Sequence, residues 1–126
     1  MKGAYAWRRF LELGVAVANG SDFPVESPNP LLGFYAAVTR QDRNGEPAAG
    51  WFPEQRMTRE EALRSWTLGG AYAAFEEGSK GSLAVGKLAD FVMLSADIMS
   101  VPLRQILSTH VTMTVVGGEV VYSETQ

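Results

Sequence analysis

The chain of 126 residues contains no cysteine and one histidine, His110. The absence of cysteine excludes disulfide bonds, thiolate-ligated zinc, iron–sulfur clusters and a thiol nucleophile, and it fits a cytoplasmic protein. A single histidine excludes a metal site built from several histidines of this chain. Any Ser-His-Asp triad would have to use His110 or a residue of another chain.

Positive charge is also in short supply. The formal net charge is -3, and the 11 lysines and arginines are scattered and outnumbered by 14 acidic residues. Nucleic-acid-binding proteins usually cluster such residues to neutralise phosphates, so we expect no nucleic-acid partner. The N-terminal apolar segment is interrupted by Arg8, Arg9 and Glu12, and no small-residue cleavage site follows it. It therefore predicts neither a signal peptide nor a membrane span.

The first half of the chain carries clear helical signals. Apolar side chains recur at helical spacing over residues 4–13, and Gly14 is a natural stop for that helix. Pro30 suits the first turn of a second helix, predicted over residues 31–39. Residues 41–56 are polar, rich in glycine and proline, and without periodicity. They predict a surface loop, of the kind that can lie over a site.

A capping box opens the next predicted helix. The Thr58 hydroxyl and the Glu61 carboxylate can each accept a hydrogen bond from an unpaired amide, and the helix then reaches Trp66. The glycines at residues 69–70 predict a break or a tight packing point. A further helix is expected over residues 71–77.

The last third of the chain reads as a small β-structure. Residues 89–94 predict a short strand, and residues 102–107 predict one or two helical turns. Residues 111–116 and 119–122 alternate in the manner of strands, and the glycine pair 117–118 supplies a two-residue turn between them. We therefore expect a β-hairpin with a companion strand.

Between the first two helices, residues 15–18 are apolar and carry valine at alternate positions. This pattern predicts a short parallel strand that is buried on both faces. The run is followed by Asp22, just before Pro24. Loops at the C-terminal ends of parallel strands carry the chemistry of α/β proteins, so Asp22 is the candidate catalytic residue. An Asx-turn or helix-cap aspartate would give the same local pattern.

For several other residues, a structural role is predicted beside any functional role. His110 is expected to be a structural or surface histidine, because no second histidine or carboxylate sits at ligand spacing. Asp90 is expected to cap a turn or backbone group. Phe23 and Glu26 fit either a substrate pocket or simple loop packing. The tryptophans are most simply core or interface aromatics: Trp7, Trp51 and Trp66.

Three segments resemble the metal-dependent amidohydrolases, especially their type-3 branch. The run NGSDFPVE at residues 19–26, followed by Pro30-Leu31 and by AAVTR at residues 36–40, looks like the eighth-strand end of those enzymes. The run GSLAVGKLADFVML at residues 81–94 is similar to the segment that returns to their small β-sandwich. The run VVGGEVVY at residues 115–122 matches their closing hairpin. The resemblance extends from about Gly14 to near the end of the chain.

The resemblance implies an α/β fold in two parts. Residues 1–78 would be the C-terminal portion of a (β/α)8 TIM barrel, comprising its last helices and strand eight. Residues 79–126 would be the C-terminal part of the small β-sandwich domain, including its β-hairpin. A complete barrel takes roughly 250 residues, so the resemblance implies that this chain supplies only the end of one.

The resemblance also implies a chemistry. Family members hydrolyse amide or other non-peptide C–N bonds with a divalent metal, zinc foremost, and Asp22 would be the strand-eight metal ligand and general base. The family's His-x-His pair, its carboxylated lysine or glutamate and its two further histidines have no counterpart here. We therefore expect this chain alone to bind no metal stably and to be inactive. The alternative is a non-catalytic interaction module, or a subunit that completes another chain.

The expected strand at residues 15–18 raises the question of its partners. In a barrel it would pair with strands on both sides, and neither neighbour is encoded here. Buried backbone groups without partners are costly, so three solutions are open. They are a complementary chain that carries the N-terminal barrel, self-association into a homo-oligomer, or a rearranged small α/β fold. We expect self-association of the isolated chain, and a small-molecule substrate for the complete enzyme.

Overall fold

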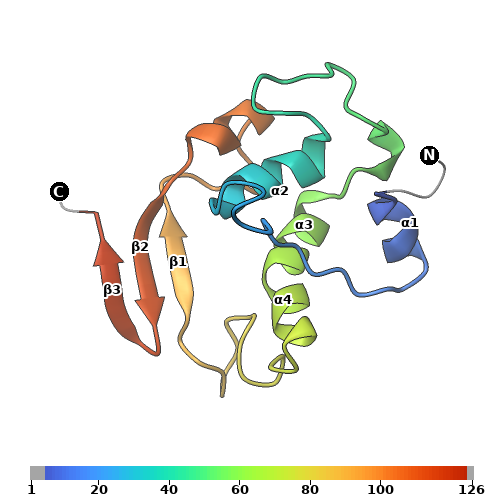
Figure 1. Cartoon of the computed structure of the whole chain (residues 1–126). Helices are drawn as coiled ribbons and strands as arrows, with labels where there is room; N and C mark the ends of the chain where they lie inside the picture. Colours follow the sequence, from blue (N-terminus) through green and yellow to red (C-terminus); the bar gives the residue numbers. More distant parts are fainter. Residues whose placement is uncertain (1–4, 125–126) are drawn as a thin grey trace.

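The computed structural model describes residues 5–124. Its elements follow in the order α1 (Trp7–Glu12), α2 (Pro30–Thr39), the short 3-10 helix η1 (Pro53–Gln55), α3 (Arg59–Trp66), α4 (Leu68–Ala73), β1 (Phe91–Leu94), the 3-10 helix η2 (Leu103–Ser108), β2 (Val111–Val116) and β3 (Glu119–Ser123). The helices gather on one side and the sheet on the other, with β3 at its outer edge (Figure 1). Within the described part of the chain, no helix combines the length and the apolarity that crossing a membrane requires.

Helix α2 lies at the centre of the molecule and forms where the sequence predicts it. Asn29 caps its start, because the Asn29 Oδ1 accepts a hydrogen bond from the Leu31 amide at 3.0 Å. Pro30 follows at the first helical position, where its missing N–H costs nothing. The helix ends at Arg40, whose left-handed backbone (φ 62°) turns the chain into the long loop.

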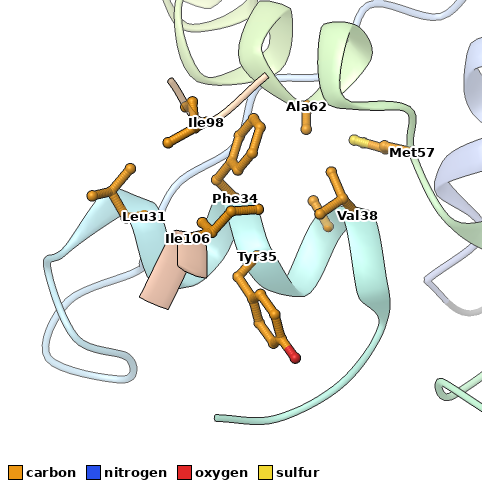
Figure 2. Close-up of a cluster of buried hydrophobic side chains, with 9 residues drawn as sticks. Leu31, Phe34, Tyr35, Val38, Met57, Ala62, Ile98 and Ile106 are labelled. Carbon is orange, nitrogen blue, oxygen red and sulfur yellow. The ribbon is translucent and has the colours of Figure 1, made fainter. Parts of the chain in front are cut away.

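Helix α3 begins with the predicted capping box and packs on α2. The Thr58 Oγ1 accepts from the Glu61 amide at 3.2 Å, and the Thr58 amide donates to the Glu61 carboxylate at 2.7 Å. Figure 2 shows the side chains of α2 meeting residues from α3 and from the segment after β1. Each large apolar side chain buried there contributes about 1.5–3 kcal/mol relative to exposure. The core residues are Leu31, Phe34, Tyr35, Ala37, Val38, Met57, Ala62, Ile98 and Ile106.

The C-terminal sheet confirms the predicted hairpin and its companion strand. Strand β2 pairs antiparallel with both β1 and β3. The two-residue turn is Gly117-Gly118, and both glycines have positive φ (59° and 86°), as tight hairpin turns require. The Asp90 carboxylate accepts a hydrogen bond from the Gly117 amide at 2.7 Å, so Asp90 takes the backbone-capping role expected of it.

The prediction of a strand at residues 15–18 is wrong for this structure. The segment is extended but belongs to no sheet, and among residues 5–124 the sheet is entirely antiparallel. A parallel strand needs neighbours distant in sequence, and the described residues offer none. The segment instead stays largely exposed, with Val15 49% accessible, so water can satisfy its backbone groups. The described residues therefore do not show the end of a TIM barrel, and the observed architecture is a small α/β arrangement with a three-stranded antiparallel sheet. The division at residue 78 stays a prediction.

The glycine pair at residues 69–70 lies inside a helix, which corrects the expected boundaries. The helical conformation is interrupted at Thr67 (φ -121°, ψ -85°). Helix α4 follows over Leu68–Ala73, instead of the expected residues 71–77. Gly69 is a tight packing point, because a Cβ there would collide with the Val17 carbonyl oxygen. The first helix, α1, is shorter than the predicted residues 4–13. Gly14 follows its end with a positive φ of +74°. Its expected first residue, Ala4, lies outside the described residues.

Candidate active site

Asp22 sits in a closed turn that follows the extended segment. The Val25 amide donates to the Asp22 carbonyl at 2.9 Å, and the Glu26 amide donates to the Ser21 carbonyl at 3.2 Å. Asp22 has a left-handed backbone (φ 50°), which aspartate tolerates better than most residues. The side chain is exposed, and within the described part of the chain its carboxylate accepts no hydrogen bond and forms no ion pair. The turn therefore presents a free carboxylate to the outside.

The turn is anchored to helix α3 through Asn19. The Asn19 amide donates to the Ser65 carbonyl at 3.0 Å, and the Asn19 Nδ2 donates to the Ser65 Oγ at 2.8 Å. Ser65 is 2% exposed and lies three residues after the buried Ala62, so it occupies the core-facing side of α3. This anchor is absent from the expectations above. A serine on the buried face of a predicted helix is the signal that could have revealed it.

Two adjoining hollows of about 510 and 450 Å³ lie beside this turn. Glu26 lines both of them, whereas Phe23 lines neither and is largely exposed. The predicted loop over residues 41–56 supplies further lining through Gln41, Asp42, Arg43 and Trp51. We call the two spaces together the aromatic hollow, after the side chains that line it: Tyr5, Trp7, Trp51 and Trp66.

Arg40 closes one side of the aromatic hollow. Its Nε donates to the Trp51 carbonyl at 2.8 Å, and its guanidinium lies 4.9 Å from the centroid of the Trp51 ring. Burial lowers the pKa of Arg40 below its usual range, with an opposing effect from the Glu54 carboxylate. In the described part of the chain, Arg40 Nη2 and Trp66 Nε1 are enclosed without a hydrogen-bond partner. Each such donor costs about 1–3 kcal/mol, so these walls are not fully satisfied by the chain itself.

The structure does not join Asp22 to other candidate ligands. His110 lies at the sheet, where its Nε2 is 3.2 Å from the Glu124 Oε2, and both side chains are exposed. This placement agrees with the surface histidine expected above. Among residues 5–124, no group of three or more histidine, cysteine or acidic side chains is placed to hold a metal ion. The described residues therefore do not fit a complete metal site, and Asp22 is a single carboxylate.

Comparison with known proteins identifies the family. The sequence model described as "Amidohydrolase family" matches residues 1–122, which is nearly the whole chain. The chain belongs to the amidohydrolase family. Enzymes of this family hydrolyse C–N bonds and generally use a divalent metal. The resemblance of the three motifs is thus confirmed at the level of the family.

Individual relatives agree and set the scale. YtcJ of Bacillus subtilis is 33% identical over 124 residues, 98% of this chain and 23% of the relative. LONG AFTER FAR-RED 3 of Arabidopsis thaliana is 37% identical over 122 residues, 97% of this chain and 20% of the relative. The N-substituted formamide deformylase of Arthrobacter pascens is 30% identical over 118 residues, which are 94% of this chain and 21% of the relative. The chain spans less than a quarter of the length of these relatives.

Proposed function

We propose that this chain supplies the strand-eight aspartate segment and the closing sandwich strands of a metal-dependent amidohydrolase that acts on amide or other non-peptide C–N bonds. The observation that carries the proposal is the Asp22 carboxylate. It stands exposed and unengaged on an anchored turn, within a chain of this family and at the position that resembles the family's eighth-strand aspartate. In the complete enzyme Asp22 serves as one metal ligand and as the general base that accepts a proton from the attacking water.

The isolated chain should be inactive under this proposal. Catalytic zinc sites use three protein ligands and leave one position for water or substrate. The described residues offer Asp22 without such a group around it. The remaining ligands would come from outside this chain, which spans less than a quarter of the length of its relatives.

The relative named N-substituted formamide deformylase suggests an N-substituted amide as the substrate class. The test is a fusion in which this chain replaces the matching segment of that deformylase. We expect the fusion to release formate from an N-substituted formamide when a divalent metal is present. Asp22→Asn should lower this activity by a factor of about 100 or more, because loss of a general base typically costs that much. Asparagine keeps the shape and tolerates the left-handed backbone, so the fold should survive.

Glu119→Gln is the matched control, since it removes one negative charge from an exposed position on β3. It should leave the activity of the fusion unchanged. If the fusion is insoluble, co-expression of this chain with the truncated deformylase gives the same readout. Full activity of the Asp22→Asn fusion would contradict the proposal. Metal-dependent amidase activity of the purified chain alone, with contaminants excluded, would contradict the expectation that the isolated chain is inactive.

A further inference from the structure

Aromatic side chains that line the hollow contact one another edge-to-face. Tyr5 meets Trp7 edge-to-face, with ring centroids 5.9 Å apart and an interplanar angle of 84°. Tyr5 also meets Trp51 at 5.3 Å and 70°. The Trp66 indole forms a further wall, because it lies directly against the backbone of Gly33. Aromatic rings prefer offset and edge-to-face neighbours, so a ring that entered the hollow would find partners of the kind it prefers.

The position of the hollow relates it to Asp22. Gly20 and Ser21, the two residues before Asp22, line the larger of the two spaces. Its volume of about 510 Å³ lies within the range of small-molecule sites. Asp22 itself lines neither space. A molecule held by the aromatic walls would have one end beside residues 20–21, in the turn that carries Asp22.

The charges around the hollow bear on which ligand fits it. Charges of both signs line the hollow: Glu26 and Arg40 at the smaller space, and Glu26, Asp42 and Arg43 at the larger one. The Arg40 guanidinium already lies over the Trp51 ring, so it occupies that aromatic face and would repel a ligand cation there. The Glu26 carboxylate would repel an anion. An uncharged ligand avoids both penalties.

We propose that the aromatic hollow binds the planar, uncharged aromatic substituent of an amide substrate. The inference rests on the proposed function where it calls the bound molecule a substrate. The binding itself requires only the residues that line the hollow. The inference assigns the walls Tyr5, Trp7, Trp51 and Trp66 to substrate selection, and Asp22 to chemistry at the neighbouring end.

The test is a binding titration of the isotope-labelled chain by two-dimensional NMR, read at the indole N–H signals of its three tryptophans. The probes form a matched series: benzamide, acetamide, benzoate and benzylammonium. Benzamide should shift the indole signals in a saturable manner. Acetamide, which lacks the ring, should bind at least about tenfold more weakly, as expected when an aromatic contact is lost. Benzoate and benzylammonium should both bind more weakly than benzamide.

Variants then locate the site. Trp51→Ala should weaken benzamide binding by about fivefold, the loss typical of one aromatic pair. Phe75→Ala is the matched control, because Phe75 is 93% exposed and lines neither space of the hollow. It should leave binding unchanged. If Trp51→Ala does not fold, Tyr5→Ala takes its place, since Tyr5 is largely exposed and contributes little to the core.

Three results would overturn the inference: no saturable binding of benzamide, equal binding of a charged analogue, or an equal effect of Phe75→Ala and Trp51→Ala. The proposed function stands or falls separately. A chain that ignores benzamide, together with a fusion whose activity depends on Asp22, would remove this inference alone. Saturable binding by the chain, together with a fusion that is indifferent to Asp22→Asn, would remove the proposed function alone.

Discussion

At the scale of single residues, Glu61 takes part in two interactions at once. Its carboxylate accepts the Thr58 amide of the capping box, and it also receives both terminal nitrogens of Arg8 at 2.6 Å. Arg8 donates as well to the Arg56 carbonyl at 2.7 Å, so this one pair ties α1 to the start of α3. The hydrogen bond from Arg8, aided by those from Thr58, lowers the pKa of Glu61 from 4.5 to about 2.

This lowered pKa predicts a pH dependence of stability. Because the folded chain holds Glu61 ionised more strongly than the unfolded chain, its contribution is complete above about pH 4.5 and is lost as the pH falls toward about 2. Glu61→Gln keeps a capping acceptor but removes the ion pair. Since the pair is partly exposed, this change should lower the free energy of unfolding at pH 7 by only about 0.5–1 kcal/mol. Urea unfolding at a series of pH values measures both effects.

The matched control is Glu60→Gln, one residue earlier in the same helical turn. It removes the same charge, and the described part of the chain shows no ion pair for Glu60. Its pH profile should follow that of the unmodified chain. If Glu61→Gln shows the same loss of stability between pH 4.5 and 2 as the unmodified chain, the assignment of the lowered pKa to stability is wrong.

The candidate site was predictable from sequence only where its signals are local. Asp22 lies in a short motif whose order of residues can be read directly, and the Thr58–Glu61 capping box has a fixed spacing. The anchor from Asn19 to Ser65 joins residues 46 positions apart, so no local pattern contains it. The aromatic hollow is likewise assembled from residues of α1, α2, α3 and the long loop. Folding, not spacing, brings them together.

At the scale of elements, the contact between α4 and the extended segment decides where the Asp22 turn is held. A Cβ at Gly69 would overlap the Val17 carbonyl oxygen and would lie 3.3 Å from the Ala18 Cα. Backbone atoms cannot swing aside as a side-chain tip can. We therefore expect Gly69→Ala to push the segment from α4 and to destabilise the chain by about 1–3 kcal/mol, as overpacking does. Thermal unfolding reports the loss, and hydrogen exchange at the Asn19 amide reports the displaced anchor.

Gly70 provides the control for this contact. It is the next residue of the same helix, and a Cβ there meets nothing within 4 Å. Gly70→Ala should therefore stabilise the chain by about 0.5–1 kcal/mol, through the ordinary advantage of alanine in a helix. Equal effects of the two substitutions would show that the close approach of Gly69 to Val17 does not limit the packing.

The predicted elements succeed or fail according to where their partners lie. Helix α2 and the β2–β3 hairpin form as predicted, because a cap, a proline and a glycine turn act within a few residues. The expected strand at residues 15–18 depends on neighbours that no nearby segment provides. The same apolar run that predicts a buried strand in a barrel is an exposed extended segment here. The sequence pattern of a segment indicates which kind of sheet it could enter. Whether it forms a strand depends on whether the rest of the molecule provides neighbouring strands.

At the scale of the whole molecule, the sheet leaves two outer strand edges open within residues 5–124. The strand order β1-β2-β3 gives β1 and β3 one neighbour each. Strand β3 is exposed along its length, and neither outer strand contains a lysine, arginine or proline that would discourage further pairing. We therefore expect the isolated chain to self-associate at micromolar concentration. Light scattering coupled to size-exclusion chromatography measures the mass.

A lysine at this edge should oppose the association. Val121 is 61% exposed and has no register partner on β2, so Val121→Lys replaces no buried contact. The charge would have to be buried or matched by any added strand, so the mass should shift toward the monomer. Val85→Lys makes the same substitution at a fully exposed site outside the sheet and should not change the mass. A monomeric mass of the unmodified chain at every concentration would contradict the prediction. An equal response to both lysines would place the contact elsewhere than β3, because only one of them touches that edge.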